Sequence, residues 1–94
     1  MDLGTAIRTL RKNKGMTAKD LAVKIRISAN AMSQIENNLV HPTKMTISKI
    51  CKALNIPPAY LLFFAITDED LPEKSKVIFN ALRGPIEEVL LKEI

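Results

Sequence analysis

Apolar residues recur along this chain every three or four positions, the spacing that places them on one face of a helix. No stretch shows the sustained alternation of apolar and polar residues, bounded by turn residues, that marks a strand. The first apolar set consists of Leu3, Ala6, Ile7 and Leu10. Residues 13–15 end this helix, because Gly15 is suited to a left-handed cap. We therefore predict an all-α fold.

Two helix start signals follow in close succession. Thr17 can cap a helix, and Asp20 three residues later forms an acidic variant of the capping box. Ser28 repeats the capping signal a short distance along the chain. Each cap follows an apolar residue that can pack on the fourth helical residue, Met16 on Leu21 and Ile27 on Met32. Two capped helices with so short a connection predict a helix-turn-helix unit.

Two more helices are predicted before an acidic turn. Thr43 can cap a fourth helix directly after Pro42, and Asn55 ends it. Pro58 suits the first position of a fifth helix. Its sequence, AYLLFFAI at residues 59–66, is apolar all round, so we expect it to be covered on more than one side. Residues 67–74, TDEDLPEK, form a turn or linker.

The last predicted helix comprises residues 75–94. At about 100° per residue, its large apolar side chains fall in one stripe about 120° wide. These residues are Ile78, Phe79, Leu82, Ile86, Val89 and Leu90. Pro85 cannot bond to the carbonyl of Ala81, so we expect a kink there, and a break into two helices at residues 84–85 is the alternative.

Length and charge add a division of the chain into two parts. Ninety-four residues suffice for one modest core with an appended element. Residues 1–52 carry ten basic and three acidic residues, whereas residues 53–94 carry four basic and seven acidic ones. The basic part predicts a site for polyanions, and a solvated lysine surface is the alternative.

Several classes of function are not supported by the residues present. His41 and Cys51 are the only histidine and cysteine, so they form neither a metal cluster nor a catalytic dyad with an orienting group. We expect Cys51 in the core and His41 in a loop. There is no glycine-rich phosphate loop, and the acidic turn lacks the glycine and distal glutamate of a calcium loop. We expect no enzyme, no metal and no cofactor.

The predicted location follows from the cysteine content and from the lack of a signal-peptide pattern or a membrane-spanning segment. A single cysteine and no signal-peptide pattern favour a reducing, cytoplasmic setting. No apolar run approaches the roughly 18 residues that a membrane span needs, so we expect no membrane partner.

The helix that begins after Ser28 has an unusual outward face. On a helical wheel, Ala31, Met32 and Ile35 fall on the buried side. The opposite side is uncharged and consists of Asn30, Ser33, Gln34 and Asn37. A solvated helix face usually carries Lys and Glu, whereas Asn, Gln and Ser suit the donors and acceptors of base edges. An ordinary polar surface is the alternative.

Positive charge flanks this face instead of lying on it. The basic residues of the neighbouring elements are Lys12, Lys14, Lys19, Lys24, Arg26 and Lys44. Phosphate contacts position a protein on DNA and base contacts specify the sequence, so this division of residue types indicates a reading helix between phosphate anchors.

Two segments together resemble a known family. They are AIRTLRKNKGMTAKDLAVKIRISANAMSQIENN and HPTKMTISKICKALNIPPAYLL, and the resemblance to the lambda-repressor-like, or Xre/Cro, helix-turn-helix domain covers residues 3–63. It implies five helices, which we place in residues 1–66. The remaining residues 67–94, outside the resemblance, form a C-terminal helical extension. The resemblance also implies sequence-specific binding of double-stranded operator DNA, usually as a dimer, at the nucleoid in the cytoplasm of a bacterial or phage-type system.

The resemblance assigns roles by position. Base-reading positions fall on Ala29, Asn30, Ser33 and Gln34. Phosphate-binding positions fall around Thr17 and Ala18 and around Asn37 and Lys44, and the charge pattern adds Lys12, Lys14 and Lys19. A structural ion pair falls on Arg11 and Glu36. The wheel supports that pair, because Glu36 lies at the edge of the buried face, where an unpaired carboxylate is costly.

Three positions depart from the family's pattern. Ala18 stands where a glutamine often braces against phosphate, and Ala29 can offer only a methyl group to a base such as thymine. Asn38 stands where the family usually has glycine, so it must take the left-handed conformation, which asparagine tolerates.

Two functions from different classes follow. The first is a regulator, most simply a repressor, that binds a palindromic operator as a homodimer. The second is an antitoxin or interaction module whose C-terminal helix binds a partner protein. A toxin-wrapping tail would be polar and disordered alone, so the apolar stripe favours self-association. The predicted dimer residues are the stripe together with Phe64, because Phe63 and Phe64 are adjacent and cannot both face inward.

Overall fold

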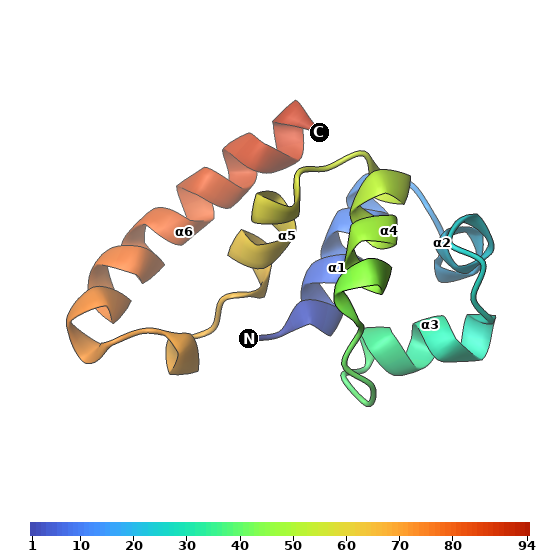
Figure 1. Ribbon diagram of the computed structural model, residues 1–94. Helices are drawn as coiled ribbons and strands as arrows, with labels where there is room; N and C mark the ends of the chain where they lie inside the picture. Colours follow the sequence, from blue (N-terminus) through green and yellow to red (C-terminus); the bar gives the residue numbers. More distant parts are fainter.

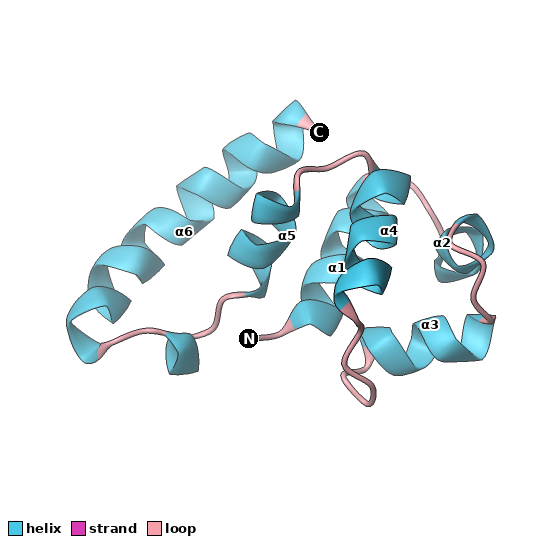
Figure 2. Ribbon diagram, viewed as in Figure 1, coloured by secondary structure: helices cyan, strands magenta, loops and turns pink.

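The computed structural model describes residues 1–94 as helices joined by loops and turns, with no strand (Figures 1 and 2). The helices are α1 (Leu3–Asn13), α2 (Ala18–Lys24), α3 (Ala29–Glu36), α4 (Lys44–Leu54), α5 (Pro58–Ala65) and α6 (Glu73–Glu93), with a 3-10 turn η1 (Asp68–Asp70) before α6. The prediction of an all-α fold is confirmed. No helix is both long enough and apolar enough to cross a membrane.

Helices α1 to α5 enclose one core. Its 16 buried apolar side chains all lie between Leu3 and Ala65, and α1 packs against each of the other four helices. Cys51 is a member of this core, as predicted, and burial raises the pKa of its thiol. The expected fifth helix is covered by α1 and α4 on one side and approached by α6 on another, which agrees with its apolar sequence.

The capping residues that mark the helix starts are confirmed. The Thr17 side chain accepts a hydrogen bond from the Asp20 amide at 3.0 Å, and the Asp20 carboxylate accepts one from the Thr17 amide at 3.2 Å. Ser28 accepts from the amide of Ala31 at 3.0 Å. Thr43 begins α4 in the same way. These bonds fix where α2, α3 and α4 begin, and hence how closely α2 and α3 follow one another.

Left-handed backbone conformations end three segments where the sequence predicts a stop. Gly15 has a φ of 68°, Asn38 of 60° and Asn55 of 54°. Asn38 therefore adopts the conformation expected of it in place of the family's glycine. A fourth such residue, Arg26, has a φ of 60° and was not anticipated.

Helix α6 is continuous through Pro85, so the alternative of two separate helices is wrong. It begins at Glu73, two residues before the predicted start, because Pro72 holds a φ of −62° that suits a helix entrance. Arg83 donates to the carbonyl oxygens of Phe64 and Ile66, which lie at the C-terminal end of α5 and have no partner within that helix. These bonds attach α6 along α5, away from α2 and α3 (Figure 1).

The assignment of Phe64 to the dimer surface needs correction. Phe64 is buried in the core, whereas Phe63 is half-buried and its ring lies 5.5 Å from that of Phe79 on α6. The two adjacent side chains do point in different directions, but the inward one is Phe64, because α5 turns that face toward α1.

The apolar stripe of α6 has one edge covered by the domain and one edge exposed to solvent. Phe79 is half-buried, and Leu90 packs against the core cluster together with Leu91 and Ile94. The other edge remains in solvent, with exposed fractions of 66% for Ile78, 52% for Leu82, 40% for Ile86 and 59% for Val89. Helix α6 thus has one edge on the domain and a free row of four large apolar side chains.

Candidate nucleic-acid interface

Helix α3 presents its uncharged side to solvent. Ala29, Asn30, Ser33 and Asn37 are exposed, and Gln34 is half-buried. On the opposite side Met32 and Ile35 are buried. The predicted reading residues Ala29, Asn30, Ser33 and Gln34 therefore lie on one accessible surface of α3, together with Asn37, which was predicted to bind phosphate.

Gln34 also fixes the loop that follows α3. Its backbone carbonyl accepts hydrogen bonds from the amides of Leu39 at 2.9 Å and Val40 at 3.3 Å. The loop consequently folds back beside the reading face and leads to Thr43 and Lys44 at the start of α4. Lys44 is exposed there, as an anchor for phosphate requires.

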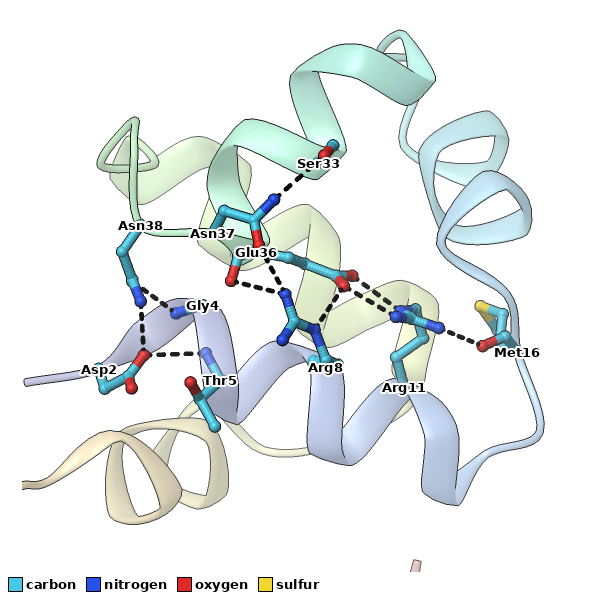
Figure 3. Close-up of polar contacts among 10 residues, drawn as sticks. All are labelled: Asp2, Gly4, Thr5, Arg8, Arg11, Met16, Ser33, Glu36, Asn37 and Asn38. Atoms are coloured by element: carbon cyan, nitrogen blue, oxygen red, sulfur yellow. Dashed lines mark hydrogen bonds and ion pairs between the residues drawn. The ribbon is translucent and has the colours of Figure 1, made fainter.

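The predicted ion pair between Arg11 and Glu36 is present and buried (Figure 3). The guanidinium donates from Nε to Oε2 at 2.7 Å and from Nη2 to Oε1 at 2.8 Å, and the residues are only 7% and 5% exposed. A third Arg11 nitrogen, Nη1, donates to the carbonyl of Met16 at 2.9 Å. This two-pronged pair joins α1 to the last turn of α3 and so holds the reading helix against the domain.

Arg8 is a residue of the site that the sequence did not reveal. It donates from Nη2 to the carbonyl of Glu36 at 3.2 Å and to Oδ1 of Asn37 at 2.9 Å. It also approaches Oε1 of Glu36 from Nε at 3.5 Å. One turn before Arg11 on α1, it therefore neutralises the C-terminal end of α3, where a cation is favourable (Figure 3).

Close packing of Gly4 against the end of α3 was also missed. A Cβ on Gly4 would lie 2.4 Å from the carbonyl oxygen of Glu36, so no other residue fits without moving that backbone. The Gly4 amide donates to Oδ1 of Asn38 at 3.0 Å, and Nδ2 of Asn38 donates to Asp2 at 2.8 Å. Hydrogen bonds from Thr5 and then Asn38 lower the pKa of the Asp2 carboxyl.

The predicted phosphate anchors lie at two places. Lys14 and Lys19 line one depression of about 550 Å³ at the turn between α1 and α2, next to Thr17 and Ala18 at the start of α2. Asp20 shares this depression, and hydrogen bonds from Thr17 lower the pKa of its carboxyl. Lys12 is exposed on α1 outside that depression.

Lys14, predicted to bind phosphate, also makes a contact that the sequence did not predict. Its ammonium donates to the carbonyl oxygen of Ile94 at 2.6 Å, at the end of α6. A cation at a helix C-terminus is favourable, which accounts for the contact. In this structure Lys14 therefore joins α6 to the domain, and Lys19 and Lys24 are the lysines of the depression that remain free for phosphate.

The turn between α2 and α3 contains an unfavourable backbone conformation at Arg26. Left-handed geometry costs an L-residue roughly 1–2 kcal/mol, and glycine avoids the cost. Replacing Arg26 by glycine should therefore raise the free energy of unfolding by about 0.5–1 kcal/mol, after the entropy that glycine gains in the unfolded chain is subtracted. Urea denaturation would measure it. Arg26→Ala removes the same charge without relieving the backbone, so an equal gain in that variant would contradict the explanation.

No group of three or more His, Cys, Asp or Glu side chains is placed to hold a metal ion. His41 is exposed in the loop between α3 and α4. The site consists of hydrogen-bonding side chains on α3, flanking cations, and the ion pairs that position α3.

Comparison with known proteins gives the same picture. A family model described as helix-turn-helix matches residues 7–61. The chain is 30% identical over 63 residues to the transcriptional regulator ClgR of Mycobacterium tuberculosis, a match that covers 67% of this chain and 56% of that protein. An uncharacterized HTH-type transcriptional regulator of the same species is 32% identical over 68 residues, 71% of this chain and 27% of the relative. The chain thus spans less than two thirds of the length of these relatives.

Two crystal structures of the clp gene regulator ClgR from Corynebacterium glutamicum are also similar. One is 31% identical with a TM-score of 0.66, over 68% of this chain and 83% of that chain. The other is 26% identical with a TM-score of 0.67, over 95% of this chain and 86% of that chain, so that match extends beyond α1–α5. The curated relatives named here are transcriptional regulators, and the solved structures are those of a clp gene regulator. This chain belongs to the lambda-repressor-like, or Xre, helix-turn-helix family of transcriptional regulators.

Proposed function

We propose that this protein is a transcriptional repressor that binds a palindromic operator as a homodimer. Residues 1–66 contact the DNA, and residues 67–94 hold two copies together. The observation that carries the proposal is the exposed, uncharged face of α3, held in place by the buried pair of Arg11 and Glu36. A repressor needs only to occupy its operator, and this activity would place the protein at the nucleoid in the cytoplasm.

Asn30 and Gln34 are the side chains best suited to read bases. Both can pair in two-pronged fashion with adenine, and Ser33 between them can donate or accept. Ala29 offers a methyl group to thymine. Thr17, Ala18, Lys19 and Lys44 at the starts of α2 and α4 lie where they can anchor phosphates on either side.

The free row of α6 supports the homodimer. Four large apolar side chains on one exposed helix edge are more than a small monomeric domain usually leaves in water. Two copies related by a two-fold axis would cover both rows with the same contacts. That axis would also place two α3 helices about 34–36 Å apart, one turn of the duplex.

The charge of the two parts fits this arrangement. The acidic residues are concentrated in residues 53–94, and α6 lies across α5 from the helix-turn-helix pair (Figure 1). A dimer formed through α6 therefore keeps its acidic surface away from phosphate, while the exposed Lys12, Lys19 and Lys44 of α1, α2 and α4 remain free to contact DNA.

Reading and anchoring residues should respond differently to substitution. After the operator is selected from a random duplex pool, Asn30→Ala or Gln34→Ala should cost about 1–3 kcal/mol of binding on that site and little on random DNA. Lys44→Ala or Lys12→Ala should weaken both alike and reduce the salt slope by about one unit. Fluorescence anisotropy titrations at several salt concentrations would measure both effects. Equal losses on operator and random DNA for Asn30→Ala and Gln34→Ala would exclude base reading by these residues.

A protein partner is the second candidate for the free row of α6. An amphipathic helix from another protein could cover the same four apolar side chains that a second copy would cover, as in helix-in-groove recognition. An antitoxin would use α6 in this way. The two candidates differ in the purified chain, because only the homodimer buries the row without a partner.

A further inference from the structure

A chain of hydrogen bonds runs from α1 to the reading face of α3. Arg8 donates from Nη2 to Oδ1 of Asn37 at 2.9 Å, and Nδ2 of Asn37 donates to Oγ of Ser33 at 3.3 Å. Figure 3 shows the three side chains in this order, with Ser33 at the outer end. Ser33 is exposed, and its hydroxyl makes no other hydrogen bond within the chain.

The direction of this chain is fixed by chemistry at its inner end. A guanidinium can only donate hydrogen bonds, so the atom of Asn37 that faces Arg8 must be the amide oxygen. The amide NH₂ group must then face Ser33, and the Ser33 oxygen must accept. Arg8 is held by the carbonyl of Glu36 at 3.2 Å, and the Glu36 carboxylate is held by Arg11. The buried ion pair therefore supports the orientation of the Asn37 amide.

Because the Ser33 oxygen accepts from Asn37, its single hydroxyl hydrogen is left for the groove. We propose that Arg8 and Asn37 are specificity-determining positioning residues, which make Ser33 a hydrogen-bond donor toward a base edge. The inference rests on the proposed DNA binding and adds to it which partner donates in the hydrogen bond between Ser33 and the base. In the major groove, guanine, adenine and thymine each present an acceptor, whereas cytosine presents only its amino donor. One lone pair of the Ser33 oxygen stays available, but accepting from Asn37 makes the hydroxyl a better donor and a poorer acceptor. Ser33 therefore favours guanine, adenine or thymine over cytosine at the position that it faces.

The Asn37→Asp variant is the sharpest test of this polarity. An aspartate still accepts from Arg8, so the contact to α1 is kept. Its second oxygen can only accept, so it takes the hydroxyl hydrogen of Ser33 and turns the oxygen lone pair outward. Ser33 can then only accept from the groove, so cytosine should be favoured at this position. Asn80→Asp is the matched control, because it makes the same exchange at an exposed residue of α6, outside the nucleic-acid interface.

The experiment is parallel selection of bound sequences from a random duplex pool with the full-length protein and its variants. In the unchanged protein, cytosine should be depleted by about two- to tenfold at one position of each half-site, the range that one net hydrogen bond gives. Ser33→Ala should remove the depletion at that position alone, and Asn37→Asp should reverse it. Arg8→Gln, whose amide can accept as well as donate, should weaken it. Asn80→Asp should leave it intact.

Base frequencies are ratios within one variant, so a uniform loss of affinity or stability does not imitate these results. Cytosine depletion that persists in both Ser33→Ala and Asn37→Asp would overturn the inference and leave the proposed DNA binding in place. Persistence in Arg8→Gln alone would overturn the part assigned to Arg8. Failure of the unchanged protein to enrich any sequence would overturn the proposed function, and the inference with it.

Discussion

Replacing Glu36 with alanine is expected to lower the free energy of unfolding by about 3 kcal/mol, because it leaves a buried guanidinium without its counterion. Arg11 is 7% exposed and donates two hydrogen bonds to the carboxylate, at 2.7 and 2.8 Å. In the variant only its bond to the carbonyl of Met16 would remain. Chemical denaturation followed by circular dichroism measures the change directly.

Two further variants separate the buried pair from its surroundings. Arg8→Ala removes a cation that also approaches Glu36, but the Arg8 side chain is 39% exposed, so we expect a loss of about 1 kcal/mol or less. In a double-mutant cycle, Arg11→Met combined with Glu36→Leu should recover most of the stability lost by Glu36→Leu alone, since no buried charge is then unpaired. An unfolding midpoint unchanged by Glu36→Ala would refute this account of the pair.

The features that could be predicted from the sequence are those whose cause is local. Thr17 and Ser28 begin helices because their own side chains bond to amides three residues later, and this follows from two positions read together. The left-handed conformation of Asn38 was predictable because the family has glycine there. Glu36 was assigned to a pair because a carboxylate on the buried edge of a helix requires a cation.

The features that were missed depend on contacts between distant segments. Arg8 is an exposed-looking arginine on an amphipathic helix, and nothing in its neighbourhood shows that it binds the end of α3. Gly4 did carry a signal, since glycine within a helix costs about 1 kcal/mol relative to alanine and usually marks a close approach. Arg26 gives no such signal, because its left-handed conformation is imposed by the packing of α2 and α3.

The packing of α6 on the domain also depends on contacts between distant segments, so the sequence alone did not predict it. The sequence predicts the stripe and its width, but only the folded domain decides which edge of the stripe is covered. Arg83 and Phe79 fix α6 against α5, and this rotation buries the edge with Phe79 and Leu90 and leaves the edge with Ile78 and Leu82 free. The dimer residues that remain predicted are therefore the four of the free row.

A charge on that free row should abolish the proposed dimer. In the Leu82→Glu/Ile86→Glu variant, forming the interface would bury two new carboxylates on each copy without partners, which costs far more than their apolar contacts contributed. The domain should still fold, because both side chains are exposed in the single chain and neither belongs to the core. Multi-angle light scattering should then give the mass of one chain for the variant and of two for the unchanged protein.

Operator binding should fall with the dimer by about 10²–10⁴-fold, because the second half-site contact is then no longer intramolecular. Val77→Glu is the matched control: Val77 is 78% exposed on α6 but lies on the side away from the free row, so it should leave both mass and affinity unchanged.

Truncation after Thr67 is a second test of the same interface, and we expect a folded monomer with similarly weak operator binding. A full-length chain that is monomeric at high micromolar concentration would rule out the homodimer and favour a protein partner for α6. A charged variant or truncated chain that still dimerises would instead show that two copies meet through another surface, and the acidic extension would then need a different explanation.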